Sequence, residues 1–207
     1  LLGSYDLPKD ISLEFTGEQE EQAENMGFLM TALLIAIGSI MLILVAQFNS
    51  LSKTLIILLS VLLSLVGVFM GMNIFQMDFI IIMTMMGIIS LAGIVVNNAI
   101  VLIDYTSILI DRAKKEKGLE KEDLLSREEY FNLILAGGKS RLRPVLLTAI
   151  TTVLGLIPLA VGLNIDFFSL FMDYDPKLYI GGDNVVFWGP LAWTVIFGLT
   201  FATFLTL

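Results

Sequence analysis

The chain has 207 residues, of which 57% are hydrophobic and 15% are charged, and its formal net charge is −8. A soluble domain of this length could not cover its surface with so little polar material, so the composition predicts a membrane protein. The acidic balance argues against a nucleic-acid partner. The absence of histidine and cysteine excludes disulfides, His-based catalytic triads and zinc sites with His or Cys ligands.

The first 25 residues differ from the rest of the chain. Residues 11–15 (ISLEF) alternate apolar and polar side chains, which predicts a short strand that Gly17 ends. Residues 18–25 are polar and favour a helix leading into the first apolar run. We therefore expect a strand and a connector helix outside the membrane.

Five apolar segments follow, each long enough to cross a hydrocarbon core of about 30 Å. We predict an all-α membrane protein with five transmembrane helices, at about residues 26–48, 54–74, 79–103, 144–163 and 185–207. A polar loop is expected at 164–184.

A long polar gap separates the third and fourth apolar segments. Residues 122–136 place apolar side chains among charges, which predicts an amphipathic helix at the membrane surface. Gly137 and Gly138 are expected to end this helix. Pro144 is expected to open the fourth span, because a helix's first turn does not need the missing N–H.

Basic residues predict how the spans are oriented. Nine of the twelve Lys and Arg residues fall between Arg112 and Arg143. Short loops rich in Lys and Arg remain in the cytoplasm, so we predict that this gap is cytosolic. Alternation then places residues 1–24 and the 164–184 loop on the opposite side.

Two adjacent amides stand out within the apolar segments. Asn97 and Asn98 point about 100° apart on a helix, so at least one must face another helix or water. They could bond neighbouring helices, at about 0.6–2 kcal/mol per contact. They could instead belong to a path for protons or water, since polar groups inside a membrane are commonly functional.

Three further polar residues lie near the ends of the third and fourth spans. Asp104 is interpreted as an interfacial acid near Arg112. Arg141 lies at the cytosolic mouth of the fourth span, where a guanidinium commonly serves as an anchor. Thr148 follows two turns later, and membrane threonines commonly bond their own helix.

The sequence predicts no enzyme. Gly138-Lys139-Ser140 resembles the end of a phosphate-binding loop, but that motif needs glycine where Leu133 stands. No nucleophile and base occur in a recognisable arrangement. We therefore expect no catalytic residues, no cofactor and no metal site.

Three linked motifs resemble the resistance-nodulation-division (RND) efflux transporters. They are GIVVNNAIVLIDY (93–105), RLRPVLLTAITTVLGLIPLA (141–160) and WGPLAWTVIFGLTFATFLTL (188–207). Their order and spacing are similar to those of the C-terminal membrane half of such a pump. In the same resemblance, residues 1–25 look like the end of a periplasmic porter subdomain with its connector helix.

The resemblance implies a multi-pass protein of the bacterial inner membrane that expels drugs or other amphiphiles by proton antiport. Its partners would be the N-terminal half of the same transporter, two further copies in a homotrimer, a periplasmic adaptor, an outer-membrane channel and the lipid bilayer. By motif position, the relay residues would be Arg141 and Thr148. The relay lysine of typical drug exporters would fall on Asn97, beside Asn98, so this chain departs from that pattern.

Other functions remain open at this point. A relative that handles lipids, metals or secretion would have the same membrane half, although metal exporters place an acid near Asn97. A membrane anchor or assembly half without transport of its own is the alternative from another class. An upstream segment with paired acids in mid-membrane would favour transport.

Overall fold

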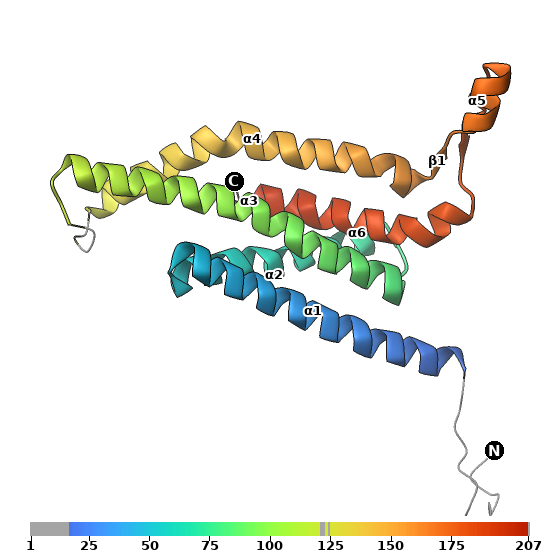
Figure 1. Ribbon diagram of the computed structural model, residues 1–207, viewed down its shortest axis with the longest axis horizontal. Coiled ribbons are helices and arrows are strands. Elements are labelled where there is room, and N and C mark those ends of the chain that lie inside the picture. The colour runs from blue at the N-terminus through green and yellow to red at the C-terminus, as the bar shows by residue number, and fades with distance from the viewer. Residues whose placement is uncertain (1–16, 121–122, 124, 207) are drawn as a thin grey trace, which may run out of the picture.

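The computed structural model describes residues 17–120, 123 and 125–206. Within these residues the chain forms six helices and one two-stranded antiparallel sheet (Figure 1). In chain order they are α1 (Glu18–Phe48), α2 (Leu51–Ile74), α3 (Ile81–Glu116), α4 (Arg127–Val161), β1 (Leu163–Asn164), α5 (Phe167–Asp173), β2 (Tyr179–Ile180) and α6 (Asp183–Thr206). All helices except α5 are long and apolar enough to cross a membrane, which confirms the five predicted spans.

Helix α6 forms the centre of the bundle. It packs most extensively against α2, α3 and α4, whereas α1 lies at one edge against α2 and α3 (Figure 1). The core contains Leu91 of α3 and Leu199 of α6, both without solvent exposure. A Cβ atom on Gly198 would lie 2.1 Å from Leu91 Cδ2, so glycine at this position allows α6 to approach α3 closely.

The outer faces of the bundle are as apolar as its interior. On α1, Leu34, Ile35 and Leu42 are all largely exposed. Such a surface would be unfavourable in water, but acyl chains solvate it without cost. The exposed apolar faces therefore fit the membrane setting that the composition predicts.

The prediction of a separate amphipathic helix at 122–136 is wrong. Helix α4 continues from Arg127 through both glycines and Pro144 to Val161. A capping box starts it, because the Ser126 hydroxyl accepts from the Glu129 N–H and the Glu129 carboxylate accepts from the Ser126 N–H. Pro144 consequently lies inside the helix rather than in its first turn.

Gly137 lies inside α4, where it faces α3. A Cβ atom at this position would lie 2.6 Å from Thr106 Oγ1 on α3, so a larger residue at this crossing of α3 and α4 would force the Thr106 side chain to move. Glycine inside a helix costs about 1 kcal/mol relative to alanine. The packing between α3 and α4 offsets this cost.

Helix α3 extends thirteen residues past its predicted end at 103, to Glu116. It then turns toward the start of α4, where the Lys117 ammonium donates to the Glu129 carboxylate. This hydrogen bond from Lys117, with those from Ser126, lowers the pKa of the exposed Glu129 carboxyl. Helices α3 and α4 are therefore two long neighbouring helices that this ion pair links near the end of α3 and the start of α4 (Figure 1).

The expected loop at 164–184 contains regular structure. Strands β1 and β2 pair Leu163 with Ile180 and Asn164 with Tyr179, and α5 lies between them. These are the strands that the structure describes, and they lie near the C-terminal end of the chain. The strand predicted at 11–15 lies outside the described residues, as does most of the predicted 1–25 region.

Candidate proton-relay site

Asn97 and Asn98 point in different directions, as their adjacency on a helix requires. Asn98 is buried, with 8% of its surface exposed, on the face of α3 that carries Val95 and Ala99 into the core. Asn97 lies on the exposed side. Neither amide forms a side-chain hydrogen bond with another described residue.

Asn97 belongs to a polar stripe along α3. Ser90, Asn97, Asp104 and Asp111 follow one another at intervals of seven residues, and all four are exposed. Gly93 lies on the same side, with open space where its Cβ would be. Residues seven apart share one face of a helix. Helix α3 therefore presents polar groups away from the core of the five-helix bundle.

Arg141 of α4 is held against α3. Its guanidinium carbon lies 4.2 Å from the centre of the Tyr105 ring, which is the geometry of a cation–π contact. Its Nε atom is buried and has no hydrogen-bond partner among the described residues. A buried N–H of a charged group without an acceptor is costly.

Thr148 lies on the exposed side of α4. Its hydroxyl is 2.9 Å from the carbonyl oxygen of Val145 and 3.2 Å from that of Pro144, and it can donate to either. Thr151 and Thr152 likewise bond carbonyls of their own helix. The Thr148 oxygen keeps its lone pairs available to accept a hydrogen bond.

The register between α3 and α4 places Asn97 and Thr148 at similar depth. The two helices run antiparallel, and they meet where Tyr105 contacts Arg141 and where Thr106 approaches Gly137. Both helices rise about 1.5 Å per residue, so equal numbers of residues from the Tyr105–Arg141 contact cover equal distances. Asn97 lies eight residues before Tyr105, and Thr148 lies seven residues after Arg141. The two residues are therefore at similar depth. The four predicted residues thus form two levels along the bundle: Arg141 at one level, and Asn97, Asn98 and Thr148 about 10 Å away from it along the helix axes.

Tyr105 is the residue that sequence reasoning missed. It lies beside Asp104 within the GIVVNNAIVLIDY motif, but its partner on α4 depends on the register between two helices. A tyrosine followed at a distance by an arginine carries no information about that register. The close crossing of Gly137 and Thr106 fixes it.

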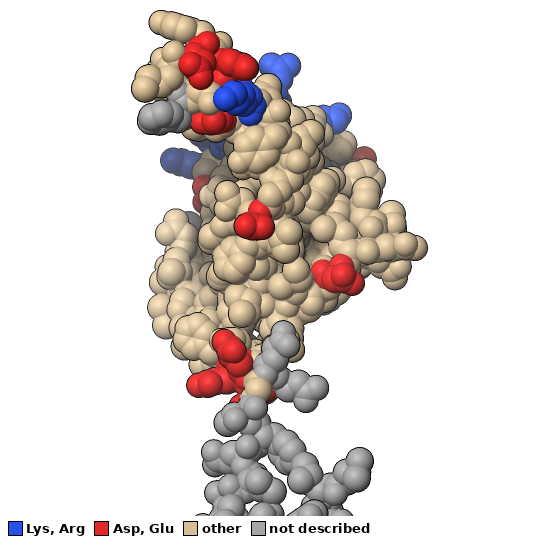
Figure 2. All heavy atoms as spheres, turned by 90° about the vertical axis from the view of Figure 1, so that its right-hand side faces the viewer, with Lys and Arg blue, Asp and Glu red and all other residues tan. Residues whose placement is uncertain are grey.

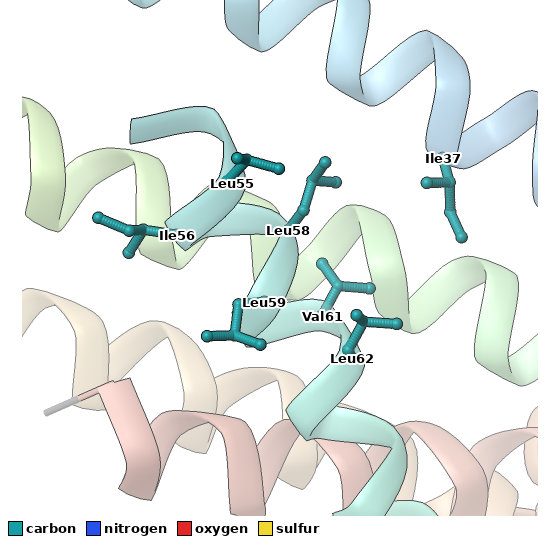
Figure 3. Close-up of a pocket in the computed structure, with 7 residues that line it drawn as sticks. All are labelled: Ile37, Leu55, Ile56, Leu58, Leu59, Val61 and Leu62. Atoms are coloured by element: carbon teal, nitrogen blue, oxygen red, sulfur yellow. The ribbon is translucent and has the colours of Figure 1, made fainter. Parts of the chain in front are cut away.

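A groove of about 480 Å³ lies between α1 and α2 (Figure 3). Ile37 of α1 faces a row of Leu, Ile and Val side chains on α2 across this space. Its lining offers no charged or hydrogen-bonding side chain. The groove suits an apolar chain and contributes nothing to a relay. In the described part of the chain, no three Asp or Glu side chains converge on a possible metal position.

Residues 2–164 match the sequence model of the AcrB/AcrD/AcrF family. The chain belongs to this family. Its members are RND transporters, so the chain is part of a multi-pass membrane transporter of a family that is typically found in the inner membrane, and it is not an enzyme. This confirms the resemblance in the three motifs.

Individual relatives align over nearly the whole chain. It is 35% identical over 206 residues to the swarming motility protein SwrC of Bacillus subtilis, covering 100% of this chain and 16% of that protein. It is 26% identical over 204 residues to the multidrug resistance protein MdtC of Erwinia tasmaniensis, covering 99% and 17%. The crystal structure of a heavy metal efflux pump superimposes with a TM-score of 0.66 at 25% identity, covering 96% of this chain and 17% of that one. The chain thus spans about one sixth of the length of these relatives.

Proposed function

We propose that this chain is the C-terminal membrane segment of a proton-driven RND exporter of drugs or other amphiphilic compounds. The observation that carries the proposal is that Asn97 on α3 and Thr148 on α4 are both exposed and lie at similar depth, with Arg141 about 10 Å away toward the end predicted to be cytosolic. Family membership and the likeness to a multidrug resistance protein support it. The working protein would include an N-terminal half, form a homotrimer, and act with a periplasmic adaptor and an outer-membrane channel.

In this proposal Asn97 and Thr148 face the N-terminal half, which supplies the titrating acid. Asn97 and Thr148 can order water or exchange hydrogen bonds with that acid, but neither gains or loses a proton near neutral pH. Arg141 remains charged and would favour the ionised form of a nearby carboxylate. A lysine at position 97 would add a second positive charge beside the acid. The Asn97 amide is uncharged and cannot supply this second charge, so in the proposal Arg141 provides the permanent positive charge at this site.

The substrate class rests on fewer observations. The names of two relatives describe multidrug resistance and swarming motility, and the similar solved structure is called a heavy metal efflux pump. A metal substrate is disfavoured because the described residues near Asn97 include no intramembrane carboxylate; Asp104, two turns away, lies toward the cytosol. Export of drugs or amphiphiles is therefore the preferred proposal.

The test uses the full-length transporter in cells and in proteoliposomes. Arg141→Ala and Thr148→Ala should each depress efflux and substrate-dependent proton flux, while protein level and trimer formation stay unchanged. Arg143→Ala is the matched control, because Arg143 is a neighbouring exposed arginine off this face of α4. If Arg143→Ala alone reduces efflux, or if all three variants behave like the wild type, the relay assignment is wrong.

A further inference from the structure

The segment between α4 and α6 is built as an ordered projection. We call residues 163–182, which contain β1, α5 and β2, the α5 hairpin. Asn164 Nδ2 donates to the carbonyls of Gly162 and Gly181, at 2.9 and 2.6 Å, and closes its base. At the start of α5, the Asp166 carboxylate accepts from the backbone N–H and the hydroxyl of Ser169, at 3.1 and 2.7 Å.

The hairpin's two connections fix its level relative to the bilayer. Residues 144–161 of α4 form an apolar helical stretch of 18 residues, or about 27 Å at 1.5 Å per residue. This length nearly equals a hydrocarbon core of about 30 Å. The chain therefore leaves the core at Gly162, and α6 re-enters it soon after Asp183. The hairpin between these points must lie at the membrane surface.

Helix α5 lies across the direction of α4 and α6 at this end of the bundle and reaches beyond α4 (Figure 1). It packs extensively against none of the five spanning helices. Phe167 and Phe171 lie four residues apart, hence on one face of α5, and are 63% and 79% exposed. Met172 and Tyr174 are also largely exposed.

Exposed apolar side chains also occur on both sides of the junction between α4 and the hairpin. Exposed apolar side chains run from Leu159 and Val161 at the end of α4, through Leu163 and Ile165, to Phe167. At the start of α6, Phe187 and Trp188 stack edge to face and are both partly exposed. Aromatic side chains concentrate at the level of lipid headgroups, where one end of the ring is apolar and the other is wet.

Charge indicates which lipids fit. Asp173 and Asp175 are exposed on the hairpin together with Lys177, so its exposed charges are two carboxylates and one ammonium, and Figure 2 shows acidic side chains on the near surface of this end of the molecule. These carboxylates would repel anionic headgroups and attract the ammonium of zwitterionic ones. In water, this exposed aromatic surface would be unfavourably hydrated.

We propose that the α5 hairpin docks into the headgroup region of the membrane leaflet at this end of the bundle and binds zwitterionic phospholipid through Phe167, Phe171 and Tyr174. The docking would fix the ends of α4 and α6 at the surface. It depends on the five-span membrane topology and not on the proposed proton relay.

The experiment places a single fluorescent label on the full-length transporter in nanodiscs of phosphatidylcholine and phosphatidylethanolamine. A cysteine at Phe171, in a protein otherwise free of reactive cysteine, carries an environment-sensitive dye. Lipids with a nitroxide near the headgroup should quench it more than lipids with the nitroxide deep in the chain, and aqueous iodide should quench it little. The label at Leu154, an exposed residue within the α4 span, should show the opposite depth preference.

Other quenching patterns would overturn the proposal. Strong iodide quenching without lipid quenching would place Phe171 in water, and protection from both quenchers would mean that protein covers it. A second label at Met172 tests the aromatic surface directly: Phe167→Ser with Phe171→Ser should reduce headgroup quenching there. Replacing half of the lipid with phosphatidylglycerol should also reduce quenching at 171, and increased quenching would contradict the zwitterionic preference.

Discussion

The Arg141 guanidinium of α4 lies over the Tyr105 ring of α3, with 4.2 Å between the guanidinium carbon and the ring centre. The contact joins two spans that carry different parts of the proposed relay. A cation–π pair contributes about 0.5–2 kcal/mol, with the larger value where water is excluded. Because the Arg141 Nε is buried without a described partner, the ring is the contact that positions the guanidinium within this chain.

We predict that Tyr105 positions Arg141 for proton coupling. In the full-length transporter, Tyr105→Leu should lower efflux and shift its pH profile, since Arg141 would no longer be held where it biases the partner acid. Tyr105→Phe keeps the aromatic face and should behave like the wild type. Efflux should be measured across a pH series at matched protein levels. An unchanged pH profile in Tyr105→Leu would show that the ring has no positioning role.

Gly137 and Gly138 should respond oppositely to alanine. At Gly137 the new Cβ would lie 2.6 Å from Thr106 Oγ1, whereas at Gly138 it would meet open space. Gly137→Ala should therefore lower the thermal stability of the purified protein. Gly138→Ala should leave stability unchanged or raise it by up to about 1 kcal/mol, through higher helix propensity.

A double variant identifies the cause of the Gly137 effect. Thr106→Ala removes the hydroxyl that the new Cβ would meet, so Gly137→Ala combined with Thr106→Ala should recover part of the lost stability. Purely additive losses would show that Thr106 is not the limiting contact.

The number of spans and their approximate positions could be predicted from the sequence because hydrocarbon thickness sets a minimum apolar length. The extent of α4 could not be predicted from the sequence in this way. Gly137-Gly138 and Pro144 have the local chemistry of a helix end and a helix start, and the close approach of Gly137 to Thr106 on α3 is not visible in the sequence. The structure within 164–184 was also missed, because the Asn164 amide donates to the nearby Gly162 carbonyl and also to that of Gly181, which lies seventeen residues further along the chain.

For the candidate site, the residues could be chosen from the sequence. Which of them lie at the same depth or in contact could be learned only from the register between α3 and α4. Asn97 and Asn98 were recognisable as unusual amides in an apolar run. That Asn98 turns into the core while Asn97 turns outward depends on which face of α3 meets α6. The pairing of Tyr105 with Arg141 likewise needed three-dimensional information.

The orientation of the bundle gives a direct prediction. Ser126 precedes α4 at one end of the molecule, and Tyr174 lies beyond its other end. Cysteines introduced singly at these two positions in the full-length protein should react with an impermeant thiol reagent from opposite sides of the membrane. The concentration of basic residues between Arg112 and Arg143 predicts that Ser126 lies in the cytosol. Labelling of both positions from the same side would contradict this topology.

We finally predict that residues 1–207 alone conduct no protons. A carrier within the membrane must gain and lose a proton near physiological pH, which requires a carboxylate or histidine with a shifted pKa. The chain has no histidine. Asp78 follows the end of α2, and Asp104 is exposed on α3 toward the end that is predicted to be cytosolic. The amides and hydroxyls at the deeper level do not titrate in this range.

Liposomes containing residues 1–207, an imposed pH gradient and an internal pH dye provide the measurement. The rate of pH change should equal that of empty liposomes, because the titrating group of the proposed mechanism lies in the absent N-terminal half. Asp104→Asn is the matched variant, since it removes the carboxylate nearest to Asn97 along the polar stripe of α3. Proton flux that exceeds the leak and disappears in Asp104→Asn would place the carrier on this chain and make Asp104, rather than Arg141 or Thr148, the centre of the relay.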